Sequence, residues 1–499
     1  MRIITWSVWV CLFTLALASW GMAAAGNDAD EAGFKPLFNG INLDGWDGNP
    51  DLWSVQDGVI VGKTTPEKPA EGNTFLVWRQ GEVDDFELRF SIRILSGNSG
   101  VQYRSKEVDK WVIGGYQADF DAPSEWSGIL YEEKGRGIIA RRGQQIHIQA
   151  DGTLLETGSV GDSAEIASKI KKNDWNEYRI FVQGNRILHA INGHATVEVV
   201  DDQVDKRSLS GLLALQLHAG PPMEVQFKDI RLKRLPLKDA KKIVLVAGKA
   251  SHGLGEHDFP AGVYLLRHCL DQVPGVIAAD YYEGWPSDPT AFDNANTILF
   301  YMDGGSGHPI IQQDRLSLLD GFMKKGVGLA LLHYAVEVPK DRGGKELLDW
   351  IGGYYETGWS TNPHWTADFK EIPKHPITSG LAPFTMNDEW YYNMRFRNNM
   401  EGVVPLLIAT PPDNTRGTRE AASHPGRPEI LSWAVERPDG GRGFGFTGGH
   451  FHAAWKDENF RKIVLNAALW TAGMEVPEGG VKSTLSEEDF TRKMRTAGN

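Results

Sequence analysis

The feature that most constrains the fold of this chain is a short aliphatic run at 243–246, followed by a polar loop. The run Ile-Val-Leu-Val has the length and composition of a strand buried on both faces, as in a parallel sheet. It ends near Gly248, and the loop beyond contains His252 and His257. Open α/β sheets carry their sites in loops at the carboxyl ends of such strands. Because the two histidines are five positions apart, they would not share a helical face, so they can converge only through the loop.

The surrounding region, from about 241 to 475, alternates strand-like and helical patterns. Strand candidates lie at 243–247, 297–301 and 327–332, and helical patterns lie at 262–273 and 311–325. This alternation predicts β-α-β units and an α/β fold with a doubly wound parallel sheet, as in flavodoxin-like proteins.

In the region from about 34 to 235, apolar and polar residues recur with a different period. Residues 86–94 and 177–182 alternate apolar and polar side chains, as strands with one buried face do. Asn192-Gly193 separates two further strand candidates and is a strong hairpin signal. Short strands at this spacing, with few helical runs, predict an all-β antiparallel sandwich of two sheets. Residues 236–240 would then link two domains, and residues 476–499 form a C-terminal tail without assigned chemistry.

The first 25 residues have the pattern of a secretory signal. Arg2 is followed by a nearly continuous apolar run at 3–17, and small residues at 23–25 precede Gly26. We expect cleavage near residue 25 and export to the periplasm or the extracellular space, with retention as a membrane anchor as the alternative. The cleaved protein would not insert in a membrane, because no later stretch is long and apolar enough to cross a bilayer.

Composition argues against one class of partner and for another. The formal net charge is −13 and the chain has no lysine-rich run, so we expect no nucleic-acid partner. The 17 tryptophans and 56 glycines suit sugar-binding clefts, in which a flat ring packs on the apolar face of a pyranose. Most of the tryptophans would still fill the domain cores.

Three polar clusters follow strand candidates of the second region. They are the loop with His252, Glu256 and His257, the segment from His333 to Glu337, and the segment with His450 and His452. We expect them to form one site that binds zinc or another divalent transition metal, or that acts as a metal-free acid–base site. The metal candidates are His252, His257, His333, His450 and His452, and the catalytic candidates are these histidines with Glu256 and Glu337. Asp388 and Glu389 are further acid candidates.

A second polar set lies in the sandwich region. Gln117 and Asp119 would point to the same side of one strand, and Gln216 and His218 to the same side of another. Arg104 follows a third alternating segment. Burial of such groups is costly unless they are paired or used. We therefore expect these five residues to bind a sugar substrate, with a purely structural hydrogen-bond network as the alternative.

The sandwich region resembles a known family. The segments LFNGINLDGW, GNSGVQYRS, GGYQADFD and GLLALQLHAGPPMEVQFKDIRLK, together with DWNEYRIFVQGNRILHAINGH, are similar to the 3-keto-disaccharide hydrolase domain, a concanavalin- or laminin-G-like jelly roll. The resemblance implies glycoside cleavage, or at least sugar binding, on the concave face. Many members carry a Glu two residues before the Gln, where this chain has Gly115, so binding without catalysis stays open. Glu132 and Glu133 are alternative acids.

The second region resembles another family. AGKASHGLGEHDF, LLHYAV, NDEWYYNMRF and GFGFTGGHFHAAW are similar to the trehalose-utilisation, ThuA-like family, which shares the class I glutamine amidotransferase fold. In the amidotransferases a nucleophilic Cys sits at the sharp turn after a buried strand, and here His333 occupies that place. The only cysteine after the signal segment is Cys269, within a predicted helix. Glutamine hydrolysis through a thiolate at that turn is therefore excluded.

The two resemblances imply the same substrate class. A ketone at C3 of a hexose acidifies the hydrogen on C2, and removal of that proton lets the glycosidic oxygen leave from C1. The reaction needs a general base and a group that stabilises the enolate oxygen, which a divalent metal could supply. We therefore expect a glycoside-cleaving enzyme that acts on 3-keto-disaccharides made by a separate sugar oxidoreductase. The alternative is a carbohydrate-binding sandwich fused to an inactive amidotransferase-like scaffold.

Overall fold

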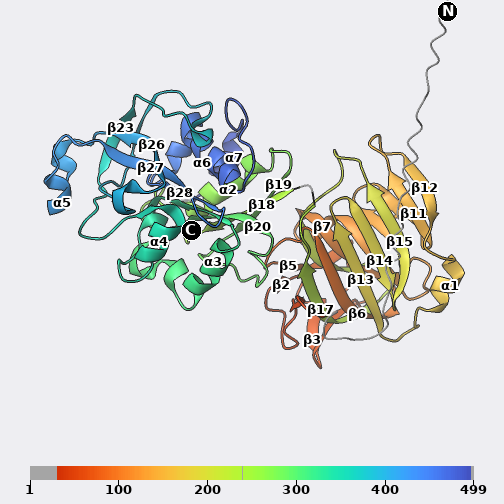
Figure 1. Cartoon of the computed structure of the whole chain (residues 1–499). Helices are drawn as coiled ribbons and strands as arrows, with labels where there is room; N and C mark the ends of the chain where they lie inside the picture. Colours follow the sequence, from red (N-terminus) through yellow and green to blue (C-terminus); the bar gives the residue numbers. More distant parts are fainter. Residues whose placement is uncertain (1–30, 239, 496–499) are drawn as a thin grey trace, which may run out of the picture. The chain divides into compact units, whose positions relative to one another are not determined.

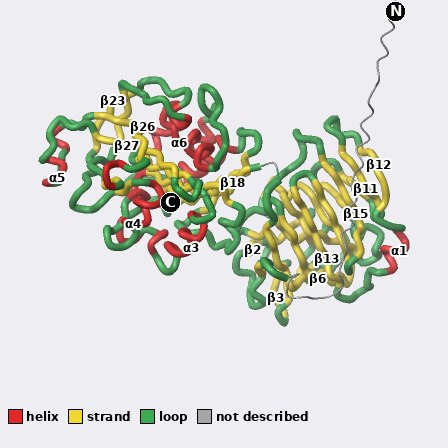
Figure 2. Tube along the Cα trace, viewed as in Figure 1, coloured by secondary structure: helices red, strands yellow, loops and turns green. Residues whose placement is uncertain are grey.

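The computed structural model describes residues 31–238 and 240–495, and the elements below lie within Phe34–Asn499 (Figures 1 and 2). The expected export signal at 1–25 lies outside the described residues. Among the residues that are described, no helix combines the length and apolar character needed to cross a bilayer.

Two sheets form the first domain. The larger sheet has the order β12-β11-β15-β14-β13-β6-β17-β4-β3, with β1 paired to β17, and the smaller one has the order β10-β9-β8-β7-β16-β5-β2. The elements are β1 Lys35–Pro36, β2 Trp46–Asp47, β3 Trp53–Gln56, β4 Val59–Lys63, β5 Thr74–Trp78, β6 Phe86–Ser96, β7 Asn98–Asp109, β8 Val112–Asp121, β9 Leu130–Glu133, β10 Gly137–Ala140, β11 Gln144–Ile148, β12 Leu154–Ser159, α1 Ser163–Ser168, β13 Asn176–Gln183, β14 Arg186–Ile191, β15 His194–Asp201, β16 Leu212–Leu217 and β17 Glu224–Arg234. The predicted all-β sandwich is confirmed.

The sandwich core forms because alternate residues of each strand point to the same side. In β13, Tyr178, Ile180 and Val182 are fully buried, and the residues between them are more exposed. The predicted hairpin at Asn192-Gly193 is confirmed, since β14 and β15 pair antiparallel on either side of it. Both residues have positive φ, 49° and 80°, as a type I′ turn requires.

A histidine inside this core makes the stability of the sandwich depend on pH. His189 is fully buried, its Nε2 atom lies 2.8 Å from the hydroxyl of Tyr103, and burial lowers its pKa to about 3. Its pKa in the unfolded chain is about 6.5, so its stabilising contribution is complete above pH ~6.5 and is lost as the pH falls toward ~3. The free energy of unfolding of the wild-type chain should therefore decrease between about pH 7 and pH 5. Replacement of His189 by Gln should make this decrease smaller by roughly 2 kcal/mol.

Urea titration followed by tryptophan fluorescence at the two pH values would measure this difference. The exposed His194 offers a matched control, and His194→Gln should keep the pH dependence of the wild-type chain. An equal pH dependence in wild type and His189→Gln would contradict the prediction.

One sheet with helices on both faces forms the second domain. Its order is β19-β18-β20-β21-β28-β27-β26, and two small two-stranded sheets pair β22 with β25 and β23 with β24. The elements are β18 Lys241–Ala247, α2 Phe259–Leu270, β19 Val276–Tyr281, β20 Ala295–Tyr301, η1 Gly305–Gly307, η2 Pro309–Ile311, α3 Arg315–Met323, β21 Gly328–Leu332, η3 His333–Val336, α4 Gly344–Ile351, β22 Gly353–Tyr354, β23 His364–Phe369, η4 Pro376–Thr378, β24 Phe384–Glu389, β25 Arg395–Phe396, η5 Asn398–Met400, β26 Val403–Ala409, η6 Asp413–Thr415, α5 Arg419–Ala422, β27 Glu429–Glu436, β28 Arg442–Phe446, η7 His452–Lys456, α6 Glu458–Thr471 and α7 Glu487–Thr491.

The strand directions explain the aliphatic run at 243–246. The pairs from β19 through β28 are parallel, whereas β27 and β26 extend the sheet antiparallel, which the sequence patterns do not indicate. Ile243 and Leu245 pack in one core with α2 and α6, and Val244 and Val246 pack in another with α3 and α4. Helices thus cover both faces of β18, so every residue of the run is buried.

Candidate functional site

The loops after four neighbouring strands begin at the same edge of the second sheet. Ala247 of β18 pairs with Tyr301 of β20, and Tyr301 pairs with Leu332 of β21. Leu332 in turn pairs with Phe446 of β28, and each of these four residues is the last of its strand. The segments that follow therefore start side by side, which brings the predicted histidine clusters to one edge.

Two imidazoles face each other at this edge. The Nε2 atoms of His257 and His333 are 2.9 Å apart. Nδ1 of His257 lies 2.9 Å from Oδ1 of Asp303, and Nδ1 of His333 lies 3.0 Å from the carbonyl oxygen of Thr447. A carboxylate and a carbonyl only accept hydrogen bonds, so each ring donates from Nδ1. In rings protonated on Nδ1 alone, both Nε2 atoms carry lone pairs, and a cation between them would stabilise this arrangement.

Glu389 and His450 complete this group. Oε2 of Glu389 lies 3.5 Å from Nε2 of His333 and 3.1 Å from Nδ1 of His450. His450 is buried, and neither of its ring nitrogens has a partner of hydrogen-bonding geometry among the described residues. With His257, these side chains offer ligand atoms that all lie within 4.8 Å of one another. We call His257, His333, Glu389 and His450 the histidine–glutamate cluster; imidazole and carboxylate donors this close could hold a divalent metal ion.

The charges of the cluster suit the binding of a divalent metal ion. Burial lowers the pKa of His257 to about 4, so its ring is neutral near pH 7. Burial opposes ionisation of Glu389, but the imidazoles of His333 and His450 outweigh it and hold the pKa of this carboxyl well below its usual range. Burial likewise opposes protonation of His450, and the adjacent Glu389 carboxylate outweighs it and raises the pKa of that ring. The cluster therefore combines an ionised carboxylate with at least one neutral imidazole.

The loops that carry the cluster have a strained backbone, and a buried carboxylate anchors one of them. His257 and His333 have φ values of +44° and +52°, in the left-handed region that residues other than glycine rarely adopt. Asp388 is fully buried and accepts hydrogen bonds from the backbone N–H groups of Gly449, at 2.8 Å, and His450, at 3.0 Å. Burial raises the pKa of Asp388. Asp388, one of the further acid candidates, thus positions the His450 loop, while its neighbour Glu389 belongs to the cluster.

Two of the predicted residues lie at the rim of the cluster. His252 is exposed, and its ring centroid is 3.9 Å from that of His257. Oε2 of Glu256 lies 3.9 Å from Nε2 of His450. Both side chains are therefore next to the cluster and reachable from solvent.

The structure places His452 and Glu337 outside the cluster. Nε2 of His452 lies 2.8 Å from the carbonyl oxygen of Phe490, so this ring points away from His450. The expectation that His452 joins His450 in the metal site is wrong because the segment does not stay extended, since η7 begins at His452. Glu337 follows η3 and accepts a hydrogen bond from the hydroxyl of Thr357, at 2.7 Å.

Two residues that the sequence analysis does not single out support the cluster. Asp303 orients His257, and its place just after β20 is the same strand-end signal that marks the histidines. Arg495 belongs to the C-terminal tail, and its guanidinium donates to Oδ1 of Asp258 at 2.8 Å. The same guanidinium also donates to the carbonyl oxygens of Ser251, His252, Gly253 and Glu256. No local pattern could reveal this contact, because Arg495 and the loop are far apart in the sequence.

The sandwich has a cavity of its own, of about 370 Å³. It is lined by Asn73, Asn98, Gln117, Asp119, Trp126, Ile129, Tyr131, Glu133, Ile138, Gln216 and His218. Gln117 donates to Asp119, and burial raises the pKa of Asp119 to about 7. The amide nitrogen of Gln216 is buried without a hydrogen-bond partner among the described residues. Four of the five predicted sugar-binding residues therefore line one cavity that contains a titratable carboxyl group.

Arg104, the fifth, does not reach this cavity. Its guanidinium is buried and donates to Oδ1 of Asp85 at 2.6 Å and to the carbonyl oxygen of Gly184 at 2.7 Å. The alternation breaks because β7 has a bulge after Tyr103, where Arg104 adopts a φ of +47°. The expectation that Arg104 lines a sugar groove is therefore wrong, and this residue stabilises the sandwich.

The adjacent Glu132 and Glu133 are both buried rather than solvated. Glu132 pairs with Arg136 at 2.6 Å, which leaves it no role in the cavity. Glu133 lines the cavity and accepts a hydrogen bond from the amide of Asn73, at 3.3 Å. Of the two alternative acids, only Glu133 is therefore placed to meet a ligand there.

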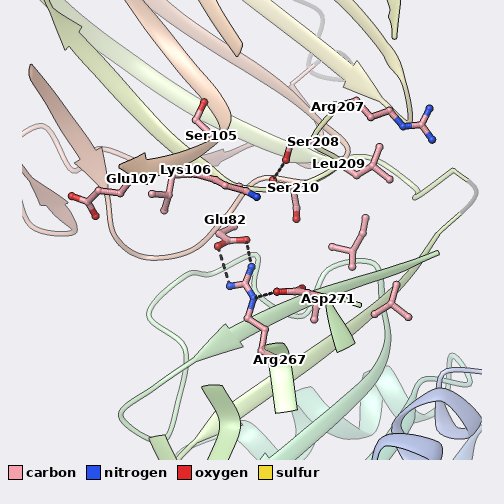
Figure 3. Close-up of a pocket in the computed structure, with 15 residues that line it drawn as sticks. Glu82, Ser105, Lys106, Glu107, Arg207, Ser208, Leu209, Ser210, Arg267 and Asp271 are labelled. Atoms are coloured by element: carbon pink, nitrogen blue, oxygen red, sulfur yellow. Dashed lines mark hydrogen bonds and ion pairs between the residues drawn. The ribbon is translucent and has the colours of Figure 1, made fainter. Parts of the chain in front are cut away.

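Another cavity, of about 410 Å³, is shown in Figure 3. Arg267 lies in it and pairs with Glu82 at 3.0 Å and with Asp271 at 3.2 Å. Asp280 is a third partner, at 2.6 Å. These carboxylates neutralise the guanidinium, and none of the predicted site residues is among those that line the cavity. We assign it no chemistry.

Comparison with known proteins matches the two parts of the chain separately. A model of the 3-keto-α-glucoside-1,2-lyase-like domain matches residues 33–233, and a model of the trehalose utilisation family, ThuA, matches residues 244–471. Comparison with curated proteins finds no match. The first match indicates a glycosyl hydrolase-like or carbohydrate-binding protein.

Solved structures similar to each part are known. A protein from Parabacteroides distasonis ATCC 8503, provisionally described as a glycosyl hydrolase, is 20% identical, with 40% of this chain and 99% of that chain covered and a TM-score of 0.29. A protein from Bacteroides uniformis ATCC 8492, provisionally described as ThuA-like, is 15% identical, with coverages of 48% and 94% and a TM-score of 0.36. A carbohydrate binding module from Bacillus subtilis is 14% identical, with coverages of 38% and 95% and a TM-score of 0.26. The chain contains a 3-keto-disaccharide hydrolase-like domain at 33–233, followed by a ThuA domain at 244–471.

Proposed function

We propose that this chain is an exported enzyme that cleaves 3-keto-glycosides, and that the histidine–glutamate cluster is where the glycosidic bond breaks. The observation that carries the proposal is the pair of Nε2 atoms of His257 and His333, 2.9 Å apart beside the carboxylate of Glu389. Burial of these polar nitrogen and oxygen atoms costs free energy unless they are paired or have a function. The match of residues 33–233 to a 3-keto-α-glucoside-1,2-lyase-like domain supports a ketone-bearing sugar as the substrate.

The reaction follows from the acidity of the carbon next to the ketone. A base removes the proton from C2, and the electron pair of that bond forms an enolate with the C3 carbonyl. The enolate then expels the glycosidic oxygen from C1, and the oxygen takes up a proton. Addition of water at C1 and return of a proton to C2 yield the free 3-keto sugar. A base and a group that stabilises the enolate oxygen are therefore required.

Glu256 and His252 suit the role of the base. Both lie at the rim of the cluster, where a substrate can reach them. The backbone N–H of Gly253 donates to Glu256 and lowers the pKa of its carboxyl group, which is therefore ionised and able to accept a proton.

A divalent metal ion, zinc or a similar ion, fits the histidine–glutamate cluster. Neutral imidazoles and a carboxylate are the ligands that such ions prefer. Asp303 and the carbonyl of Thr447 fix the ring orientations of His257 and His333, as partners of metal-ligating histidines commonly do. When bound, the ion would stabilise the negative charge that develops on the enolate oxygen.

The sandwich cavity would bind the sugar through Gln117, Asp119, Gln216 and His218. One observation favours a second candidate, in which the sandwich itself breaks the bond. Asp119 has a pKa of about 7 inside the cavity, and a carboxyl group with that pKa can serve as a general base or acid near neutral pH. In either case the substrate needs a ketone at C3, so a separate sugar oxidoreductase that oxidises the C3 hydroxyl must act first.

Incubation of the intact chain with a 3-keto-disaccharide in D₂O tests the proposal. We expect release of monosaccharide and deuterium at C2 of the released 3-keto sugar, whereas the parent disaccharide without the ketone should stay intact. Replacement of His333 by Ala should lower the turnover number by about 100-fold or more, whereas Asp119→Asn should leave it within about 10-fold of the wild-type value. Loss of turnover in Asp119→Asn alone would move the chemistry to the sandwich. No release by the wild-type protein would leave a sugar-binding protein and overturn the proposal.

A further inference from the structure

We infer that a cavity next to the histidine–glutamate cluster holds the leaving sugar of the substrate, and that the carboxyl group of Glu337 donates the proton to the glycosidic oxygen. This inference rests on the proposed function and assigns a residue and a subsite to it. The cavity has a volume of about 470 Å³, and its lining belongs entirely to the second domain. It is lined by Gly305, Ser306, Tyr334, Glu337, Pro339, Lys340, Glu356 and Thr357.

Tyr334 joins the cavity to the cluster. It follows His333 directly in the chain and lines the cavity. Its ring centroid is 5.9 Å from that of His257 and 6.4 Å from that of Tyr391. The hydroxyl of Tyr391 in turn lies 3.4 Å from Nε2 of His333. Only the ring of Tyr334 would therefore separate a sugar bound in the cavity from the cluster. The two halves of one disaccharide, which share a single glycosidic oxygen, must lie this close together.

Glu337 has unused hydrogen-bonding capacity in this cavity. Within the described part of the chain, the hydroxyl of Thr357 is the one donor to its carboxylate, at 2.7 Å, although a carboxylate can accept about four hydrogen bonds. Burial raises the pKa of Glu337 although the hydrogen bond from Thr357 opposes this rise, and the nearby charge of Glu389 adds to the effect of burial. Burial and the charge of Glu389 favour the protonated form, which a proton donor needs.

Glycine leaves Tyr334 and Glu337 open to a ligand. A Cβ atom at Gly305 would lie 3.4 Å from the hydroxyl oxygen of Tyr334 and 3.9 Å from Oε1 of Glu337. Gly305 has a φ of +67°, which residues with a side chain rarely adopt. No side chain therefore covers these two oxygens from the side of Gly305.

The charges of the cavity select the chemical class of its occupant. The carboxylate of Glu356 is already engaged by Arg395, at 2.6 Å, and by the hydroxyl of Tyr354, at 3.0 Å. Lys340 is exposed, and its Nζ lies 3.7 Å from Glu356. An acidic sugar would meet the carboxylate of Glu356, whereas the hydroxyl groups of a neutral sugar could form hydrogen bonds with the carboxyl group of Glu337. We therefore assign the cavity to a neutral, polyhydroxylated leaving group.

In the step that involves Glu337, the electrons of the C1–O bond leave with the glycosidic oxygen. The proton of the Glu337 carboxyl group passes to that oxygen as the bond breaks, so the leaving sugar departs as a neutral alcohol. The carboxylate left behind regains a proton from water. The C2 proton goes separately to the base at the rim of the cluster, and no oxidant or reductant is needed.

Two substrates with different leaving groups test this inference on the intact chain. Replacement of Glu337 by Gln should lower the turnover number for a 3-keto-disaccharide by about 100-fold or more, because a sugar alkoxide is a poor leaving group without a proton. Turnover of the 4-nitrophenyl 3-keto-glucoside should change by less than about 10-fold, because nitrophenolate leaves without protonation. Glu371, an exposed glutamate of the same domain, provides the matched control, and Glu371→Gln should resemble the wild-type chain with both substrates.

The outcomes separate this inference from the function on which it rests. A similar loss with both substrates would assign Glu337 to structure and overturn the inference, as would an unchanged turnover of the disaccharide. A wild-type chain that prefers a 3-keto-disaccharide with a uronic acid as its leaving group would overturn the assignment to a neutral sugar. A wild-type chain that cleaves neither substrate would overturn the proposed function and this inference together.

Discussion

Replacement of His333 by Ala should abolish most of the divalent-metal binding that we propose for the histidine–glutamate cluster. The ring of His333 lies at the centre of the cluster, with its Nε2 atom 2.9 Å from that of His257 and 3.5 Å from Glu389. Removal of an outer-shell partner typically lowers metal affinity by about 10–100-fold, and removal of a ligand should cost at least as much. Metal content after equilibration with zinc, and affinity measured by competition with a chelator, would give the size of the loss.

Two other histidines make this test specific. His194 is exposed in the sandwich, and His194→Ala should keep the metal content of the wild-type chain. His452 is buried but bonded to the carbonyl of Phe490, so His452→Asn should keep the metal as well. Metal content that stays unchanged in His333→Ala, or that falls only in His452→Asn, would contradict the assignment of the cluster.

Replacement of Arg495 by Ala should weaken metal binding without removal of any ligand. The Arg495 guanidinium ties the tail to the loop before His257, through Asp258 and carbonyl oxygens of the loop. Without it, the loop that positions His257 is held by fewer bonds, and we expect metal affinity to fall by about 10–100-fold. Hydrogen exchange of the amides of residues 251–257 should become faster, because their local opening costs less free energy.

Two variants of the tail show whether the guanidinium itself is responsible. Arg495→Lys keeps the charge but cannot present several N–H donors in a planar fork, so it should recover only part of the affinity. Arg492 lies in the same tail and contacts the hydroxyl of Tyr264 at 3.3 Å, away from the loop. Arg492→Ala should therefore bind metal as the wild-type chain does. Equal affinity in Arg495→Ala and the wild-type chain would show that the loop is held without Arg495.

The elements of both domains follow from local patterns that the sequence displays openly. Alternation in β13 predicts a strand with one buried face, and Tyr178, Ile180 and Val182 are buried on that face. The aliphatic run at 243–246 predicts a strand covered on both sides, as β18 is. These patterns work because side-chain direction along a strand depends only on the pleat. They fail at Arg104 and His452, where a bulge and a 3-10 turn interrupt the pleat.

Sequence patterns also indicate which strands end in polar loops, and therefore that His257, His333 and His450 belong near one edge of a sheet. Which ring nitrogen faces which partner depends on Asp303, on the carbonyl of Thr447 and on the backbone angles of the loops. Those contacts join segments that are distant in the chain, so no local period encodes them. Only the tertiary structure places Arg495 on the loop before His257 and Glu337 in the cavity next to the cluster. The physical reason is that both placements depend on long-range packing of the second domain.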